Sequence, residues 1–125
     1  MADARLRVLA IDHVQLAMPA GKEAEARGFY AGVLGLNEVS KPPALASRGG
    51  VWFEGGAVKV HLGVDPDFRP VRKAHPAFLI DDLDDLCRVL RSAGCQIRED
   101  DGLPGQRRIY VDDPFGNRIE FLERI

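Results

Sequence analysis

The segment AVKVHLGV at residues 57–64 alternates between two kinds of position. Val60 and Leu62 fall on one face, and Lys59 and His61 fall on the other, which is the pattern of a strand with one buried face. A lone histidine in such a strand is ordinarily a core residue that hydrogen-bonds a neighbour. Evidence for any other role of His61 has to be found in the rest of the sequence.

The residues before this strand complete a βαβββ unit. The predicted elements are, in order, a strand at 7–18, a helix at 21–35, a short strand at 36–40 and a hairpin at 50–64. Gly35 ends the helix, and Pro42 and Pro43 mark a loop. The hairpin is expected to turn at Gly55 and Gly56, a pair suited to a tight primed turn.

The same order of elements follows residues 65–74, a polar, proline-containing segment that we interpret as a linker. The predicted elements are a strand at 75–80, a helix at 81–94, a short strand at 95–99 and a hairpin formed by 106–112 and 117–123. Asp81 is the expected N-cap of the helix. Its apolar stripe consists of Leu83, Leu86, Cys87 and Leu90. The chain is therefore predicted to be one α+β domain, 1–125, with tandem modules at about 7–64 and 75–125.

The spacing of the histidines supports a duplication. His75 follows His13 by 62 residues, each in the first strand of its module, and Glu120 follows His61 by 59 residues, each in the last strand. All three histidines of the chain and one glutamate thus occupy two equivalent positions of a repeated unit. Three histidines scattered at random would rarely do so.

Imidazole and carboxylate groups are common ligands of first-row divalent metals. A repeat folded about a pseudo-twofold axis brings equivalent strand positions together, so His13, His61, His75 and Glu120 are candidate ligands of one ion. A carboxylate between Ile119 and Phe121 costs free energy to bury unless it is paired or bound to a cation. The alternative for Glu120 is a solvent-facing position at a sheet edge.

Charge and hydropathy argue against several classes of protein. The net charge is −2 with no basic run near the N-terminus, which argues against nucleic-acid binding. No apolar stretch approaches the roughly 20 residues of a membrane span, and the N-terminus lacks a signal-peptide pattern. We expect a cytoplasmic protein in which Cys87 and Cys95 are reduced and structural.

Several motifs together resemble the vicinal oxygen chelate superfamily, which includes glyoxalase I, the bleomycin-resistance proteins and the extradiol dioxygenases. They are IDHVQLAM followed by FYAGVLGL, then AHPAFLIDDLDDL, and finally DPFGNRIEFLE. The resemblance covers nearly the whole chain. It implies two curved, mixed sheets that form a cup around a divalent metal, with the helices outside, and it implies a homodimer.

The resemblance also implies a ligand set of His13, His61, His75 and Glu120 for zinc, nickel, iron or manganese. Bacterial glyoxalase I has a glutamate where this chain has His61, and it uses carboxylates in its proton transfer. A metal-bound neutral imidazole does not serve readily as that base, so Glu120 is the candidate catalytic residue. In extradiol dioxygenases and fosfomycin-resistance enzymes the ligand set resembles two histidines and one glutamate. His13, His75 and Glu120 match that smaller set, and His61 would be an additional residue.

The function expected from this set is that of a metal-dependent lyase or isomerase of the glyoxalase type. Its substrate would be a small oxygen-rich molecule that chelates the metal through two neighbouring oxygens, and the developing oxyanion would be stabilised electrostatically. One alternative is an iron-dependent dioxygenase, which needs open coordination positions and hence His61 off the metal. The other is a metal-free protein that sequesters a ligand, although such a protein does not need a complete ligand set.

Five further residues are candidates for substrate contact: Gln15, Arg48, Trp52, Lys59 and Tyr110. For each, an ordinary surface or core role is the alternative. Several cations near the expected cup suggest an anionic substrate, whereas the Arg72-Lys73 and Arg107-Arg108 pairs are interpreted as solvated. The sequence leaves open whether the four ligands meet within one chain or across two.

Overall fold

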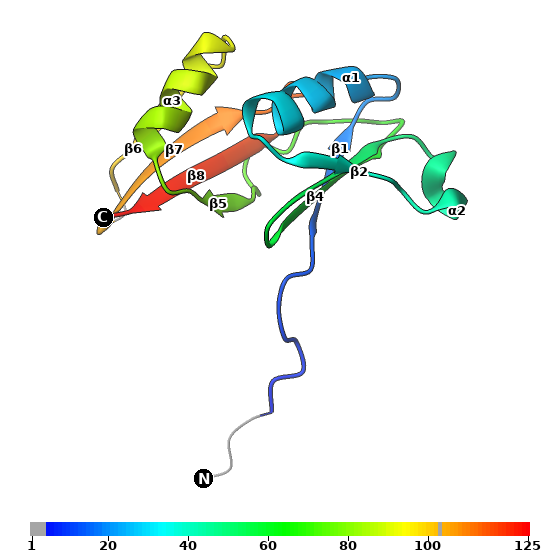
Figure 1. Ribbon diagram of the computed structural model, residues 1–125, viewed down its shortest axis with the longest axis horizontal. Coiled ribbons are helices and arrows are strands. Elements are labelled where there is room, and N and C mark those ends of the chain that lie inside the picture. The colour runs from blue at the N-terminus through cyan, green and yellow to red at the C-terminus, as the bar shows by residue number, and fades with distance from the viewer. Residues whose placement is uncertain (1–4, 103) are drawn as a thin grey trace.

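The computed structural model describes residues 5–102 and 104–125 and has the predicted α+β architecture of two similar modules (Figure 1). Each module contains one four-stranded mixed sheet, with strand orders β1-β4-β3-β2 and β5-β8-β7-β6. The first sheet contains β1 (Val14–Met18), β2 (Asn37–Val39), β3 (Val51–Gly55) and β4 (Val58–Val64). The second contains β5 (Ala77–Leu79), β6 (Arg98–Asp100), β7 (Gln106–Asp112) and β8 (Arg118–Arg124).

The strand registers confirm the duplication. In the parallel pair β1·β4, Gln15 lies opposite His61, and in the parallel pair β5·β8, Ala77 lies opposite Glu120. His13 and His75 each stand two residues before these partners. Both expected first strands begin later than predicted, so the two histidines lie just outside β1 and β5.

The helices lie on one side of both sheets (Figure 1). They are α1 (Glu23–Ala26), the π-helix η1 (Arg27–Val33) that continues it, and α3 (Leu83–Ser92), while the short α2 (Pro43–Ala46) lies beside the first sheet. The core fills the space between helices and sheets. Its members include Phe29, Tyr30, Phe53, Val60, Leu62, Leu83, Leu90, Ile109, Ile119 and Phe121.

Three local predictions were wrong in detail. Residues 27–33 form a π-helix, where Gly28 and Gly32 weaken the α-helical turn. The expected loop at Pro42 contains a turn of helix, because proline is favoured at the first helical position. Asp82 replaces Asp81 as N-cap of α3, and its side chain accepts a hydrogen bond from the Asp85 amide at 3.0 Å.

The first hairpin also turns one residue later than expected. Gly55 pairs with Val58, so Gly56 and Ala57 form the two-residue loop. Only the first of these loop residues has a positive φ, 55°, as a type II′ turn requires.

A buried hydrogen-bond network joins the two modules and gives a physical reason for the FY and DPFGN motifs. The Tyr30 hydroxyl of η1 donates to Asp113 Oδ2 at 2.7 Å. Asn117 Nδ2 donates to the same carboxylate at 3.0 Å and to the Ala17 carbonyl of β1 at 2.9 Å. Asn117 Oδ1 accepts from the Val71 amide at 3.1 Å. One turn of the second module thus binds the first strand and the first helix of the other.

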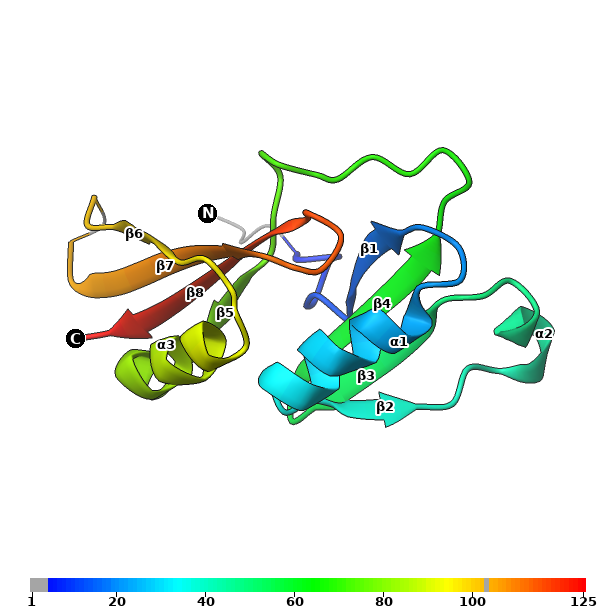
Figure 2. The ribbon, with the colours of Figure 1, turned by 90° about the horizontal axis from the view of Figure 1, so that it is seen from above.

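Residues 65–76, between β4 and β5, form neither helix nor strand and run along one edge of the molecule (Figure 2). Residues 5–11, which precede Asp12, extend away from the sheets (Figure 1). Cys87 and Cys95 are free thiols whose pKa values burial raises. Within the described ranges, no helix is long and apolar enough to cross a membrane.

Candidate metal-binding residues on two sheet faces

The candidate residues gather on the face of each sheet that is opposite the helices. We call these the first open face, with Gln15, Trp52, Lys59 and His61, and the second open face, with Arg108, Tyr110, Arg118 and Glu120. Strand alternation accounts for both, since Val60 and Leu62 in β4, and Ile119 and Phe121 in β8, point into the core.

His61 is stacked between two aromatic rings on the first open face. The Trp52 ring lies parallel to its imidazole with centroids 3.8 Å apart, and the His13 ring lies at 4.3 Å. The side chain is 8% exposed. Burial, followed by the charge of His13, lowers the pKa of His61. The imidazole is therefore neutral near pH 7, which is the form that ligates metals.

The orientation of His13 is set by its neighbour Asp12. Nδ1 of His13 donates a hydrogen bond to Asp12 Oδ2 at 2.9 Å, and this bond is the main reason why the pKa of Asp12 is lowered. Nε2 is consequently the ring nitrogen with the free lone pair. Lys59 lies 3.8 Å from Asp12 and 3.8 Å from Glu54, so this candidate substrate contact is engaged in ion pairs.

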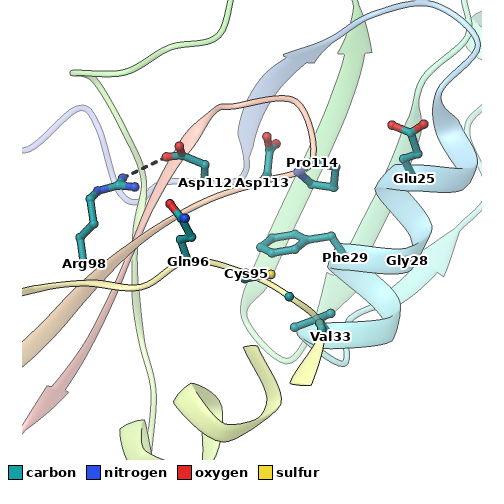
Figure 3. A pocket seen from close by; sticks show the side chains of 12 residues that line it. Glu25, Gly28, Phe29, Val33, Cys95, Gln96, Arg98, Asp112, Asp113 and Pro114 are labelled. Carbon is teal, nitrogen blue, oxygen red and sulfur yellow. Dashed lines mark hydrogen bonds and ion pairs between the residues drawn. The ribbon is translucent and has the colours of Figure 1, made fainter. Parts of the chain in front are cut away.

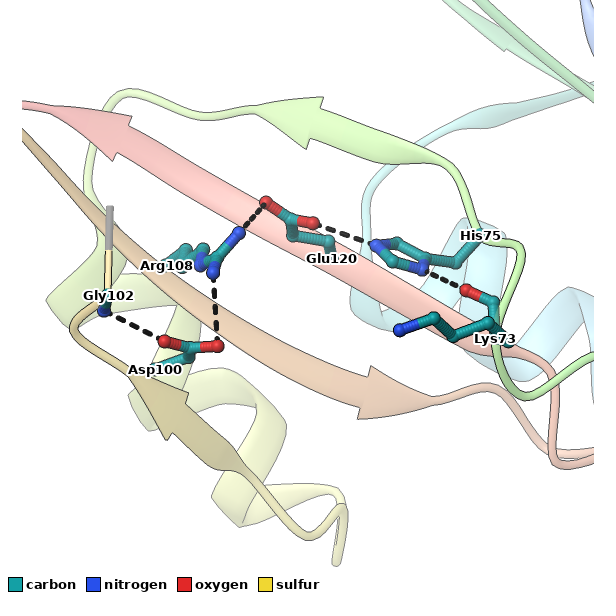
Figure 4. Close-up of polar contacts among 6 residues, drawn as sticks. All are labelled: Lys73, His75, Asp100, Gly102, Arg108 and Glu120. Atoms are coloured by element: carbon teal, nitrogen blue, oxygen red, sulfur yellow. Dashed lines mark hydrogen bonds and ion pairs between the residues drawn. The ribbon is translucent and has the colours of Figure 1, made fainter. Parts of the chain in front are cut away.

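His75 and Glu120 form the corresponding pair on the second module (Figure 4). His75 Nδ1 donates to the Lys73 carbonyl at 2.7 Å, and its Nε2 lies 2.8 Å from Glu120 Oε1. A carbonyl only accepts, so Nδ1 carries the proton. The lone pair of a neutral imidazole would then face a carboxylate oxygen, an arrangement that needs a cation, either a second ring proton or a metal ion.

Arg108 also contacts Glu120, contrary to the prediction that it is solvated. Its Nη1 lies 3.7 Å from Glu120 Oε2 and its Nη2 lies 3.1 Å from Asp100 Oδ2 (Figure 4). The side chain is 21% exposed. Arg107, the preceding residue, points to the opposite face and pairs with Asp84 at 2.9 Å. Alternation with the buried Ile109 could have separated the two arginines from sequence.

The remaining substrate candidates fall into two groups. Gln15, Arg48 and Trp52 line a cavity of about 260 Å³ beside the first open face. The Gly50 amide next to it donates to Glu23 Oε2 at 2.9 Å and so is not free for a ligand. Tyr110 lies on the second open face, where its ring contacts His75 edge-on with centroids 5.3 Å apart.

A larger cavity, about 570 Å³, lies between the modules on the helical side. Phe29, Cys95 and the Arg98–Asp112 ion pair are among the residues that line it (Figure 3). None of the four candidate ligands lines this cavity. Its size alone does not make it the functional site.

The four candidate ligands thus lie in two pairs, His13 with His61 and His75 with Glu120. Across residues 5–102 and 104–125 of a single chain, no three His, Cys, Asp or Glu side chains are grouped closely enough to hold a metal ion. The donor chemistry of each pair suits a divalent metal. The 2.8 Å between Nε2 of His75 and Oε1 of Glu120 is an ordinary hydrogen-bond distance, so these two atoms already face each other.

Comparisons with known proteins agree with this fold. The profile of the Glyoxalase/Bleomycin resistance protein/Dioxygenase superfamily matches residues 10–121. A glyoxalase family protein of Bacillus anthracis is 44% identical, with a TM-score of 0.94 over 98% of this chain and 100% of that one.

Two further solved structures are more distant. Lactoylglutathione lyase of Agrobacterium tumefaciens is 25% identical (TM-score 0.69; 94% of this chain and 96% of that one). TnmS3, an antibiotic-binding protein of Streptomyces sp. CB03234, shares the fold at 19% identity (TM-score 0.74; 97% and 100%). No curated protein is significantly similar to the chain.

Proposed function

Because the chain belongs to the Glyoxalase/Bleomycin resistance protein/Dioxygenase superfamily, we propose that it is a divalent-metal-dependent lyase or isomerase of the glyoxalase type. Its substrate is a small oxygen-rich molecule that chelates the metal through two neighbouring oxygens. The ligands are His13, His61, His75 and Glu120, and the ion is zinc, nickel, iron or manganese.

The observation that carries this proposal is the hydrogen bonding of two equivalent histidines. In both His13 and His75, Nδ1 is bonded to an oxygen acceptor, a carboxylate in one and a backbone carbonyl in the other. This leaves Nε2 of His13 to bind a cation, and Nε2 of His75 faces Glu120 Oε1, with which it would share one. In most protein metal sites an outer partner likewise fixes the imidazole tautomer. A histidine with only a core role has no need of this arrangement at two repeated positions.

We propose further that two chains assemble each site. One chain supplies the His13–His61 pair and a second copy supplies the His75–Glu120 pair, because the pairs do not meet within one chain. The apolar surface supports a homodimer. Exposed large apolar side chains on residues 5–13 and on β5 include Leu6 (79%), Val8 (82%), Leu9 (90%), Ile11 (88%) and Leu79 (57%), more than a monomer ordinarily leaves in contact with water.

In the proposed reaction the candidate residues have different roles. A bound divalent ion supplies positive charge that stabilises an oxyanion developing on the substrate. Glu120 is the one carboxylate of the set, so it would take the proton from the substrate carbon if it leaves the metal during turnover. His61, neutral and held by stacking, helps to position the ion, while Trp52 excludes water from one side of its ring.

The first test is metal content by mass spectrometry on protein purified without a histidine tag. We expect about one equivalent per chain in wild type and a marked loss in His61→Ala and Glu120→Gln. Glu99→Gln removes an exposed carboxylate on β6 and should retain the metal. If none of the proteins binds metal after reconstitution with several ions, the metal-dependent function is refuted and the sequestering alternative takes its place.

The identity of the ion then selects the activity assay. Nickel or zinc directs the search to isomerase and lyase substrates. Iron directs it to oxygen uptake, and uptake coupled to ring cleavage would replace the proposed reaction with the dioxygenase alternative.

A further inference from the structure

We propose that Arg108, Tyr110 and Arg118 form a subsite for an oxyanion, and hence that the substrate is a small anion carrying a carboxylate or phosphate group. This inference rests on the proposed function and specifies its substrate class. It depends on residues of the second open face other than the candidate metal ligands.

The subsite is built around one aromatic ring. Tyr110 of β7 lies directly opposite Glu120 of β8. The guanidinium carbon of Arg118 lies 5.2 Å from the centre of the Tyr110 ring, and that of Arg108 lies 5.6 Å from it. Strand alternation places all of these side chains on the same face as Glu120. Two guanidinium groups are therefore gathered beside the proposed reaction centre.

Two cations held at one ring repel each other, and contact with the ring offsets only part of that cost. Arg108 has two carboxylate partners, Asp100 and Glu120. Arg118 has no ion-pair partner within residues 5–102 and 104–125. In addition, a metal ion bound to Glu120 would partly neutralise the negative charge of that carboxylate. The face thus retains positive charge that its own carboxylates leave unmatched.

The hydrogen bonding of the two arginines is also incomplete. Nε of Arg108 and Nε of Arg118 are both buried, and neither finds an acceptor in the part of the chain that the structure describes. A buried donor left unpaired costs about 1–3 kcal/mol, and such groups usually have a partner. Both side chains are partly exposed overall, so a ligand can approach them from the open side of the sheet.

Guanidinium groups match one class of ligand particularly well. Their N–H groups form a planar fork that binds the paired oxygens of carboxylate or phosphate. An oxyanion here would lie next to Glu120, the proposed base. A substrate held in this way presents its neighbouring oxygens to the metal and its anionic group to the arginines.

The test measures binding of inorganic phosphate and of acetate by isothermal titration calorimetry, at constant ionic strength with chloride as background. It is run on protein as purified and again after metal removal. We expect at least one of the two anions to bind wild type, and the one that binds identifies the oxyanion. Arg118→Ala should weaken that binding at least tenfold, and Arg118→Lys should fall between, because lysine keeps the charge but lacks the fork.

Arg124→Ala is the matched control, since Arg124 lies on the same strand and the same face but at its exposed end. It removes the same charge and should change the affinity less than twofold. Absence of anion binding to wild type, or equal weakening by Arg118→Ala and Arg124→Ala, would overturn the subsite. Metal content measured in parallel separates the proposals: anion binding without metal refutes only the metal site, and metal without anion binding refutes only the subsite.

Discussion

Replacing Asn117 by alanine should destabilise the protein strongly, although Asn117 is not one of the proposed metal-binding or oxyanion-binding residues. Its side chain is fully buried and makes three hydrogen bonds, to the Val71 amide, the Ala17 carbonyl and the Asp113 carboxylate. At about 1 kcal/mol each, the expected loss in the free energy of unfolding is about 3 kcal/mol. For a chain of this length that corresponds to a fall in Tm of roughly 12 °C.

The assay is urea and thermal unfolding followed by circular dichroism, with all proteins at the same concentration because a dimer's stability depends on it. Asn37→Ala, at an exposed position in β2, serves as control and should change the free energy by less than about 0.5 kcal/mol. A loss below about 1 kcal/mol in Asn117→Ala would refute the reasoning. It would mean that the network does not join the modules as described.

Three further predictions concern the first module. The chain contains one tryptophan, Trp52, stacked on His61, so one equivalent of nickel should quench its fluorescence in wild type and not in His61→Ala. Asp12→Ala should weaken metal binding about tenfold in a competition titration, because His13 loses its orienting partner. Hydrogen bonds from backbone amides lower the pKa of Glu23 below its ordinary 4.5, so the ionised carboxylate contributes stability above pH 4.5 that is lost as the pH falls through the lowered value. The stability difference between wild type and Glu23→Gln should accordingly be constant above about pH 5.5 and shrink in acid.

Each of these three predictions would be contradicted by a specific result. Quenching that persists in His61→Ala would place the bound nickel elsewhere. Unchanged metal affinity in Asp12→Ala would mean that the orienting hydrogen bond does not matter. A stability difference for Glu23→Gln that grows in acid would reverse the sign expected for a carboxyl group with a lowered pKa.

Strand alternation made the open faces predictable from the sequence. Val60 and Leu62 against His61, and Ile119 and Phe121 against Glu120, assign these side chains to opposite faces without further information, and the strand registers confirm that alternation. The repeat predicted that His61 and Glu120 occupy equivalent positions in the two modules, and the strand registers show this equivalence. The metal role of these residues stays a prediction.

Other features could not be predicted for physical reasons. Asp81 and Asp82 are equally good caps by type, and only the entry angle of the chain selects Asp82. The pairing of Arg108 with Glu120 depends on the register of a hairpin, which the sequence pattern left open. Whether the two ligand pairs meet depends on how modules and chains are arranged, a long-range property that no local spacing encodes.

The most direct test of the account is a complementation measurement. His61→Ala chains and Glu120→Gln chains are co-expressed with different tags, and the mixed dimer is isolated and its metal content determined. A site shared between chains predicts that each mutant homodimer lacks metal. The mixed dimer then regains one equivalent, in the site that takes His61 from one chain and Glu120 from the other. A mixed dimer that stays as empty as its parents would contradict the shared site.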